Sequence, residues 1–486
     1  MVGITGIGSG IDIDSIVTAM VNAERAPKTN QLDRLEKTTV ARISAMGSLT
    51  SALNTFKTAV DSLNKTSLFE SRTASSSNTS ALKVTAATTA PAGNYNVQVK
   101  QLATSSKVAL QSVAGGNTAT FNSGSLTISA GSSSFDVDIT ASNNTLAGMR
   151  DAINEAGKSS GVSATIITDD SGSRLVLSST KSGAGNDIQV VASEDNVTTG
   201  ANALTSQALV PTVDPGNADA FIKPDSTTGA GGVITKAQSA KLSIDGLELV
   251  RDTNRIADAL EGVTLDLTAA QSATDLADGK TISVTVGVDK SSVKSNLQKF
   301  VDAYNALIST TSQLTAVVPV DGGNPVTGPL LGDSSIRNVL SSLRNEMVKM
   351  TGEDGVRALA DLGITTEKDG KLKLDDTKLT KALESNFDQV AGYLAGDNGL
   401  MGRLSKSVGA YVGTTGVLKQ RTDALQATKV GVDEQRKVLA IRVESLQTRL
   451  YAQYNAMDSL VGRLQKTSES LANQLASLPG FVRKDK

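Results

Sequence analysis

Two stretches of regularly spaced apolar residues, one near each end of the chain, constrain the fold most strongly. In the N-terminal stretch the apolar positions are Leu32, Leu35, Met46, Leu49, Leu53, Phe56, Val60 and Leu63. In the C-terminal stretch they are Val432, Leu439, Val443, Leu446, Leu450, Met457, Leu460, Leu464, Leu471 and Leu478. Steps of three and four residues over this many turns are typical of the apolar seam of a coiled coil. The sequence therefore predicts two long terminal helices that pair as a coiled coil or helical stalk.

The N-terminus before the first seam is rich in glycine. Gly3, Gly6, Gly8 and Gly10 alternate with Ile4, Ile7, Ile11 and Ile13. Because four glycines in ten residues disfavour a helix, we expect this stretch to be flexible in the free chain and ordered on assembly. A frayed terminus is the alternative interpretation. Asp14 is expected to cap a short helix over residues 15–24, and Pro27 to open a second helix that runs to about Asn64.

The middle of the chain is predicted to be mostly β structure. Period-two alternation predicts strands at residues 81–87, 93–102, 125–128, 134–139, 162–168 and 174–178, with an amphipathic helix over 145–156. Residues 192–232 contain Pro211, Pro215 and Pro224 and are predicted to be irregular. Strands return from Ala240 with a hairpin turn at Asp245–Gly246. Helices are predicted at 291–314, 334–349, 379–394 and 399–408. The predicted class is α+β and multidomain, with β-rich modules inserted between paired terminal helices.

Composition excludes several classes of function. The 486 residues carry a net charge of −2, which gives no electrostatic case for nucleic acid or an anionic membrane as a partner. The chain has no Cys and no His, so disulfides, thiolate nucleophiles, Cys/His zinc sites and His-based triads are excluded. No apolar run is long enough to span a bilayer, and residues 1–10 lack the regions of a cleaved signal peptide. An exported chain would therefore keep its N-terminus.

Candidate sites for chemistry are few. Gly6, Gly8 and Gly10 lack the preceding strand and the lysine of a phosphate loop, and Asp12 and Asp14 do not extend into a calcium loop. A glycosidase-type pair among Asp136, Asp138, Asp169 and Asp170 stays open, because the spacing of such a pair is set in three dimensions. Only 3% of the residues are aromatic and none is Trp, which disfavours a sugar-stacking cleft. We expect no enzyme activity, no cofactor and no metal.

Several segments, in the same order, resemble one protein family. The opening GITGIGSGIDIDSIVTAMVNAERAPKTNQLDRLEKT resembles the N-terminus of the flagellar filament cap family, also called flagellar hook-associated protein 2. The segments LSIDGLELVRDTNRIADALEGVTLDL, TISVTVGVDKSSVKSNLQKFVDAYNALI, GPLLGDSSIRNVLSSLR and LADLGITTEKDGKLKLDDTKLTKAL resemble its C-terminal part. Residues 125–190, with SLTIS, LAGMRDAINEAG and SRLVLSSTKSGAGNDI, resemble a repeat module found in flagellins and hook-associated proteins. The resemblance covers nearly the whole chain and is weakest over 192–235.

The resemblance implies a homo-oligomeric ring at the tip of the bacterial flagellum. Such a ring retains exported flagellin and promotes its folding and insertion, so that the filament elongates and the cell is motile. Further implied partners are hook–filament junction proteins and a flagellar export chaperone. The implied location is extracellular, after type III export without signal cleavage.

The expected domains are nested, and their order follows the family. Residues 1–70 with 431–486 form a terminal coiled-coil domain that is flexible in the free protein, and 71–103 with 286–430 form a helical leg domain. Residues 104–124 with 236–285 form a β-rich domain, and 125–235 form an outer β-rich domain that contains the repeat module.

Assembly contacts are expected from the N-terminal isoleucines and the two seams. The C-terminal seam is longer than its N-terminal partner, so pairing within one chain would leave part of its apolar face exposed to solvent. Packing of that face against other subunits is therefore favoured. The expected contact residues are Ile4, Ile7, Ile11, Ile13, Leu32, Leu35, Leu49, Leu53, Phe56, Leu63, Leu439, Val443, Leu446, Leu450, Met457, Leu460, Leu464 and Leu471. The alternatives are a purely internal helical hairpin, another axial protein such as a flagellin or junction protein, an adhesin that binds host mucin or glycan, and a carboxylate hydrolase of surface polymer.

Overall fold

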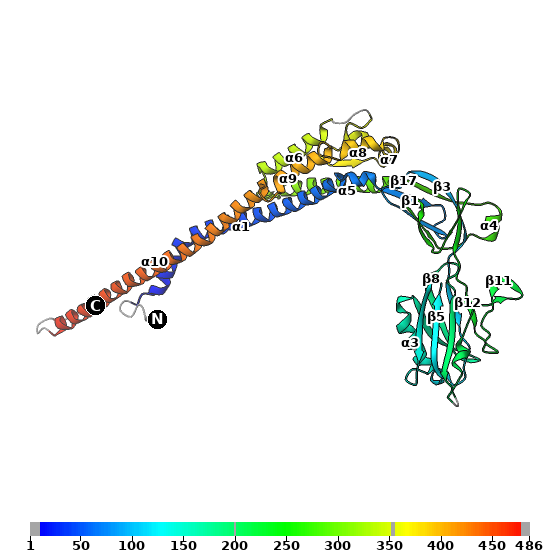
Figure 1. The fold of residues 1–486 in the computed structure, drawn as a ribbon. Helices are drawn as coiled ribbons and strands as arrows, with labels where there is room; N and C mark the ends of the chain where they lie inside the picture. Colours follow the sequence, from blue (N-terminus) through cyan, green and yellow to red (C-terminus); the bar gives the residue numbers. More distant parts are fainter. Residues whose placement is uncertain (1–9, 199–200, 351–354, 478–486) are drawn as a thin grey trace. The chain divides into compact units, whose positions relative to one another are not determined.

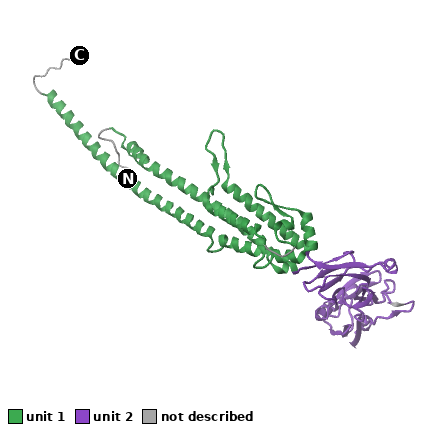
Figure 2. Ribbon diagram, turned by 90° about the horizontal axis from the view of Figure 1, so that it is seen from above, with its two compact units in different colours: residues 1–69, 290–486 green, residues 70–289 purple. Residues whose placement is uncertain are grey.

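The chain divides into two compact units in this computed structural model, which describes residues 10–198, 201–350 and 355–477. Residues 1–69 and 290–486 make up unit 1, and residues 70–289 make up unit 2 (Figure 2). Unit 1 is helical and unit 2 is almost entirely β structure. The predicted class, α+β with long terminal helices and inserted β-rich modules, is therefore confirmed.

Unit 1 is built on two long helices that run antiparallel, α1 (Ile13–Leu63) and α10 (Val417–Ala476) (Figure 1). Its other helices are α2 (Thr66–Glu70), which ends at the boundary of unit 2, α5 (Lys290–Thr315), α6 (Ser334–Val348), α7 (Asp376–Ser385), α8 (Phe387–Leu394) and α9 (Leu400–Val412). Two short hairpins join them: β18 (Val317–Val318) with β19 (Val326–Thr327), and β20 (Ile364–Thr366) with β21 (Leu372–Leu374).

The core of unit 1 lies where α1 meets the shorter helices. The second half of α1 buries Leu49, Leu53, Phe56 and Leu63 in one cluster with α5, α6 and α9. The Phe56 ring lies 5.5 Å from that of Phe300, measured between centroids, and this pair fixes α1 against α5. The predicted stripe on α5 is buried as expected, because its apolar residues recur at helical spacing.

The start of α1 differs from the prediction. The two helices expected on either side of residue 26 are one continuous helix that contains Pro27. Proline removes one helical hydrogen bond, but Val21 and Leu32 are buried on either side of it and hold both halves in line. The N-cap is Asp12 and not Asp14, because the Asp12 carboxylate accepts a 3.0 Å hydrogen bond from the Ser15 amide.

The helix predicted over 379–394 is in fact two helices, α7 and α8. They are separated at Asn386, whose φ of −137° lies outside the helical range. The C-terminal seam, by contrast, lies in one helix. At 60 residues and 1.5 Å per residue, α10 is about 90 Å long.

Unit 2 contains two hydrophobic cores, and each is enclosed by its own strands. The first core lies among β1 (Arg72–Ser76), β2 (Leu82–Ala86), β3 (Gly93–Gln101), β13 (Ala240–Ile244), β14 (Leu247–Arg251), β15 (Arg255–Leu260), β16 (Val263–Leu267) and β17 (Ile282–Val288). These strands form sheets of order β1-β17-β3-β13-β14 and β15-β16-β2, with α4 (Ala273–Ala277) between β16 and β17. We call this part the inner β module. The predicted turn at Asp245–Gly246 joins β13 to β14, and φ is positive at both residues, 48° and 84°.

The second core belongs to the outer β module, which spans residues 105–235. Its sheets have the orders β12-β4-β8-β7 and β6-β5-β9, and α3 (Leu146–Ala156) contributes Leu146, Met149 and Ile153 to the core. The strands are β4 (Ser105–Ala109), β5 (Ser123–Ala130), β6 (Ser133–Ile139), β7 (Val162–Asp169), β8 (Gly172–Ser182), β9 (Ile188–Asn196) and β12 (Gly232–Thr235). A further pair, β10 (Val213–Asp214) with β11 (Asn217–Phe221), lies in the segment predicted to be irregular.

The structure places two segments differently from the expected domains. Residues 71–103 were expected with the helical leg, but β1 and β3 pair with β17 and complete the inner sheet. Residues 104–124 were expected with the inner strands, but Val108, Leu110 and Phe121 are buried in the outer core. In both cases strand pairing between distant segments decides the placement, and the local sequence pattern does not report it.

Candidate assembly surface on the terminal helices

The N-terminal end of α1 is anchored on α10 by a small apolar cluster. Ile13, Val17 and Val21 follow one another at helical spacing and pack around Leu450. Val443, Leu446, Tyr451 and Tyr454 surround them, and the Tyr454 hydroxyl donates a 3.3 Å hydrogen bond to the Met20 Sδ atom. A hydrogen bond with the Asp14 carboxylate raises the pKa of Tyr451. The first seam thus starts at Ile13, about five turns earlier than the predicted Leu32.

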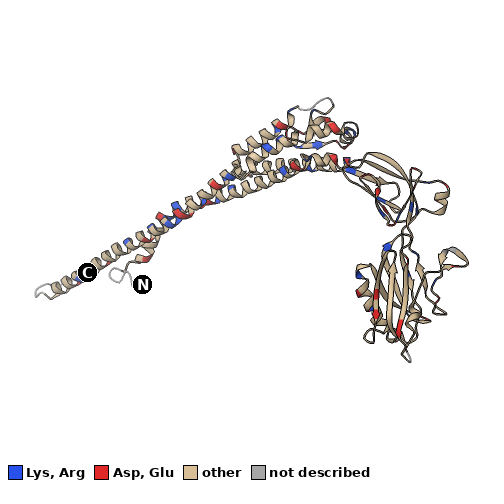
Figure 3. Ribbon diagram, viewed as in Figure 1, with Lys and Arg blue, Asp and Glu red and all other residues tan. Residues whose placement is uncertain are grey.

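Ion pairs fix the register of α1 on α10 closer to the bundle. Nη2 of Arg436 lies 2.5 Å from Oδ1 of Asp33 and 2.6 Å from Oε2 of Glu36. Leu32 and Val432 are both buried beside this pairing. Figure 3 shows the two signs of charge mixed along both long helices and not separated by sign. The pairing of α1 with α10 is therefore specified by contacts between individual residues and not by long-range attraction between oppositely charged helices.

The two helices are not in close apolar contact around Pro27. Between Val21 and Leu32, α1 presents Glu24 and Lys28 where the seam pattern would require apolar residues. One groove here is lined by these two residues and by Val438, Leu439 and Arg442 of α10. A second groove is lined by Arg25 and Thr29 of α1 and by other residues of α10. Leu439 and Val443 line both grooves and are only half-buried. These α10 residues keep apolar surface that α1 does not cover.

Beyond Tyr454, α10 carries a row of exposed apolar side chains. Met457, Leu460, Leu464, Leu471 and Leu475 are between 42% and 60% exposed. They recur at steps of three, four and seven, so they lie along one face of the helix. We call this set the α10 stripe. A row of large apolar side chains along one exposed helix face is typical of a surface that binds another segment.

The predicted contact residues separate into three groups. Leu49, Leu53, Phe56 and Leu63 are fully buried in the bundle of their own chain. Ile13, Leu32 and Leu450 are buried between α1 and α10. Ile11, Leu35, Leu439, Val443, Leu446, Met457, Leu460, Leu464 and Leu471 are exposed or half-buried, and Ile4 and Ile7 lie outside the described residues. Val17 and Val21 were missed, although their four-residue spacing from Ile13 is a readable helical signal.

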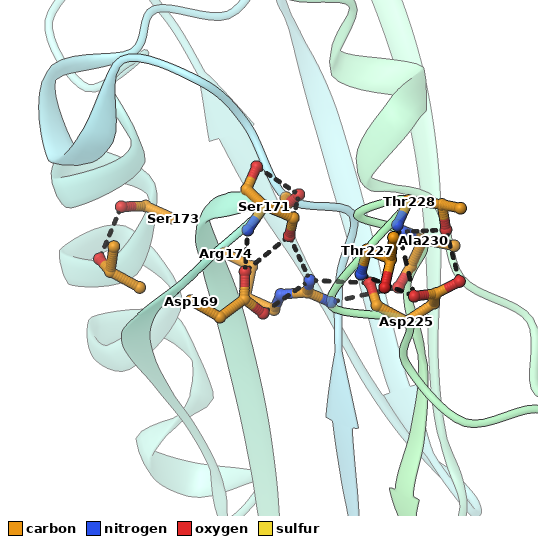
Figure 4. Close-up of polar contacts among 10 residues, drawn as sticks. Asp169, Ser171, Ser173, Arg174, Asp225, Thr227, Thr228 and Ala230 are labelled. Carbon is orange, nitrogen blue, oxygen red and sulfur yellow. Dashed lines mark hydrogen bonds and ion pairs between the residues drawn. The ribbon is translucent and has the colours of Figure 1, made fainter.

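Two of the carboxylates considered for hydrolysis, Asp169 and Asp136, make structural contacts in the outer β module. Asp169 pairs with the buried Arg174, with 2.8 Å between Oδ2 and Nη2, and accepts a hydrogen bond from the Ser171 hydroxyl (Figure 4). Arg174 also donates to the carbonyl oxygens of Asp225 and Ala230. The Ser171 hydroxyl and the Arg174 charge hold the pKa of Asp169 below its usual value, whereas the general acid of a glycosidase needs a raised pKa. Asp136 is exposed and accepts from the Thr127 hydroxyl. These contacts give no support to a hydrolase site.

Membrane-spanning helices and metal clusters bear on the choice of partners. Within residues 10–198, 201–350 and 355–477, no helix combines the length and apolarity needed to cross a bilayer. The same ranges hold no group of three or more His, Cys, Asp or Glu side chains placed to share a metal ion.

Comparison with known proteins identifies the family. Residues 9–106 match the model of the flagellar hook-associated protein 2 N-terminus, residues 237–466 that of its C-terminus, and residues 125–181 the flagellin hook IN motif. The chain is 46% identical to the B-type flagellar hook-associated protein 2 of Pseudomonas aeruginosa, with 99% of this chain and 98% of that protein covered. It is 33% identical to the flagellar hook-associated protein 2 of Escherichia coli, with 96% and 97% covered.

A solved structure shares the fold. The crystal structure of the D1, D2 and D3 domains of the flagellar cap protein FliD from Escherichia coli matches with a TM-score of 0.55 at 30% identity, covering 79% of this chain and 99% of that one. The class defined by this fold is a multidomain flagellar protein with β modules inserted into a helical stalk. The chain belongs to the flagellar hook-associated protein 2 (FliD) family.

Proposed function

We propose that this protein is the non-enzymatic cap at the tip of the bacterial flagellar filament. In this proposal several copies form a ring that retains exported flagellin and promotes its folding and insertion at the distal end. The observation that carries the proposal is the α10 stripe, a row of exposed apolar residues that runs for about 27 Å along α10 from Met457 to Leu475. The relatives and the solved structure, by their names, are hook-associated and cap proteins.

The energetics of the α10 stripe suit a contact that forms and breaks repeatedly. Full burial of one leucine side chain is worth about 1.5–3 kcal/mol. The side chains of the stripe are already about half-covered by their own helix, so each has about 1 kcal/mol left to gain. Five such residues could supply about 5 kcal/mol per subunit before the cost of ordering. A contact of this size holds a subunit yet releases it when flagellin is added.

The β modules and the bundle take different roles in the proposal. The bundle and long helices of unit 1 act as legs that contact filament and junction proteins, and unit 2 forms the plate that closes the tip. Export proceeds through the flagellar type III apparatus with a dedicated chaperone and without cleavage. The grooves beside Pro27 add a second apolar surface for neighbouring subunits or for flagellin.

The proposal can be tested on isolated filaments. Filaments assembled in vitro from purified flagellin, which carry none of this protein, are incubated with purified full-length protein and examined by immunogold electron microscopy. We expect label at one end only, and we expect Leu464→Glu to lose it while Lys466→Gln, on the opposite face of α10, keeps it. Label along the filament sides, or equal labelling by both variants, would contradict the proposed role of the α10 stripe.

A further inference from the structure

The β18–β19 hairpin of unit 1 exposes apolar side chains that its own chain leaves uncovered. Val318 lies directly opposite Val326 in this hairpin, so the two side chains share one face. They are 53% and 62% exposed, and Val320, which leads into the turn, is 45% exposed. A single exposed valine is ordinary, but three on one small hairpin form a surface that suits contact with another molecule.

The base of the hairpin is fixed on the end of α5. The Gly328 amide donates a 2.8 Å hydrogen bond to the Ala316 carbonyl oxygen, and the Leu330 amide donates a 3.0 Å bond to the Leu314 carbonyl oxygen. A Cβ atom at Gly328 would lie 2.3 Å from that Leu314 oxygen, so glycine allows the close return of the chain. The hairpin is therefore an anchored projection with exposed valines.

Prolines on both sides of the turn decide how the hairpin can bind. Pro319 follows β18 and Pro325 precedes β19, and proline cannot donate a backbone hydrogen bond. Prolines at the edge of a sheet oppose the addition of another strand. A partner must therefore receive the side chains of the hairpin, because it cannot readily extend the sheet.

A groove between α1 and α5 has walls that suit small apolar side chains. Small residues line it, namely Thr55, Thr58, Ala59 and Ser62 of α1 with Ala303 and Ala306 of α5. The three hydroxyl groups donate to carbonyl oxygens four residues earlier in α1, at distances of 2.8 to 3.1 Å. Since these hydroxyls are already paired, the walls require no hydrogen bond from an occupant and can pack against its apolar atoms.

Charge identifies the hairpin as the occupant of this groove. Asp321, in the turn, is the one charged residue in the sequence from 316 to 328, and Lys299 lines the groove. Neither side chain forms an ion pair within the part of unit 1 that the structure describes. Asp302 also lines the groove, but its carboxylate accepts a 2.8 Å hydrogen bond from the Gln298 side chain. Lys299 is thus the cation that can receive Asp321.

The hairpin and the groove also agree in length. Val318 lies three residues before Asp321, about 10 Å in extended chain. Ala306 lies seven residues after Lys299, about 10.5 Å along α5. An occupant that places Asp321 beside Lys299 therefore brings Val318 to Ala306.

We propose that the β18–β19 hairpin of one copy docks in the α1–α5 groove of a second copy, with Val318 and Val326 against Ala306 and Asp321 beside Lys299. Within one chain Val318 and Val326 stay exposed, so the hairpin does not fill its own groove. The contact joins two different surfaces, and such head-to-tail contacts close into a ring when the rotation between copies allows it. This use rests on the proposed function, in which the copies form a ring.

The small size of the contact has a consequence for the free protein. A stable interface buries about 800 Å² on each partner, far more than three valines and one ion pair supply. Free copies should therefore meet only transiently through this contact. Chemical trapping suits such a contact better than a measurement of oligomer size.

Disulfide trapping between two single-cysteine variants tests the contact, because the chain has no Cys of its own. Full-length Val318→Cys with a long tag is mixed with untagged Ala306→Cys at high concentration, oxidised and analysed on a non-reducing gel. A dimer of mixed size reports a bond between positions 318 and 306, which needs Cα atoms within about 7 Å. Val430→Cys with Ala306→Cys is the matched control, since Val430 is 67% exposed and lies on α10.

Docking raises the concentration of one thiol near the other, so the mixed bond should form about tenfold faster with Val318→Cys than with Val430→Cys. Lys299→Glu in the Ala306→Cys copy should slow this bond, and Asp321→Lys in the Val318→Cys copy should then restore it. Both positions are on the surface, so these changes test the pairing of charge and not the fold.

Three results would overturn the inference. The first is equal rates in test and control mixtures, and the second is a rate that Lys299→Glu leaves unchanged. The third is a double variant, Val318→Cys/Ala306→Cys, whose bond forms within one chain at low concentration. The filament-tip test of the proposed function uses neither the hairpin nor the groove, so either idea can fail while the other stands.

Discussion

Leu450→Ala should release the start of α1 while the bundle stays folded. Leu450 is 8% exposed and is the α10 residue around which Ile13, Val17 and Val21 pack. Large-to-small changes of this kind cost about 2–5 kcal/mol, and a site between two helices at the edge of a unit can relax, so we take about 2–3 kcal/mol. At 1.4 kcal/mol per factor of ten, this corresponds to roughly 30- to 150-fold more frequent local opening.

Hydrogen exchange of the full-length protein measures this opening residue by residue. Amides of residues 17–24 should exchange roughly 30- to 150-fold faster in Leu450→Ala, whereas those of residues 49–63, buried against α5 and α9, should not change. Val430→Ala is the matched control, because Val430 lies on the same helix and is 67% exposed. Unchanged exchange over residues 17–24, or equal acceleration over 49–63, would refute the assignment of this cluster as the separate anchor of the N-terminal half of α1.

Four other expectations can be measured on single variants or conditions. Arg174→Met removes the donor that ties β7 and β8 to the 225–230 loop and should lower the unfolding free energy by about 2–4 kcal/mol in urea; an unchanged midpoint would count against it. Asp169 has a pKa lowered from 3.8, so its stabilising contribution is complete above that pH and is lost as the pH falls through the lower folded value; an acid titration of stability should show a slope that Asp169→Asn reduces. Pro27→Ala should stabilise α1 by about 1–3 kcal/mol in thermal unfolding, and a loss of stability would show that the proline is needed there. Leu464→Glu should reduce motility on swim plates while circular dichroism shows the β signal intact; wild-type swimming would contradict the contact role of the α10 stripe.

The seams were predictable from sequence, but their partners were not. Spacing of three and four correctly placed Leu53 and Phe56 on a buried helix face, yet the same pattern arises whether that face meets another subunit or α5 of the same chain. The structure assigns these two residues to the chain's own core and leaves Leu464 uncovered. A periodic pattern reports that a face is apolar; only the three-dimensional arrangement reports what covers it.

Strand existence was likewise easier to predict than strand pairing. The hairpin of β5 with β6 and that of β13 with β14 are local and follow from alternation and turn residues. Pairing of β1 with β17 joins residues more than 200 positions apart, and no local signal specifies it. The role of Arg174 was not predictable for the same reason, because local sequence does not report contacts between distant residues. Its partners Asp225 and Ala230 lie about 50 residues away in a loop predicted to be irregular. Pro27 was misread because a proline inside a helix is tolerated only where tertiary contacts hold both halves.

The most direct test of the cap function is made in the host bacterium. The gene is deleted, and monomeric flagellin in the culture supernatant is measured together with filament length. The account predicts abundant leaked flagellin with short or absent filaments, restored by the wild-type gene or by purified protein added to the culture. Filaments of normal length with no leaked flagellin would contradict it.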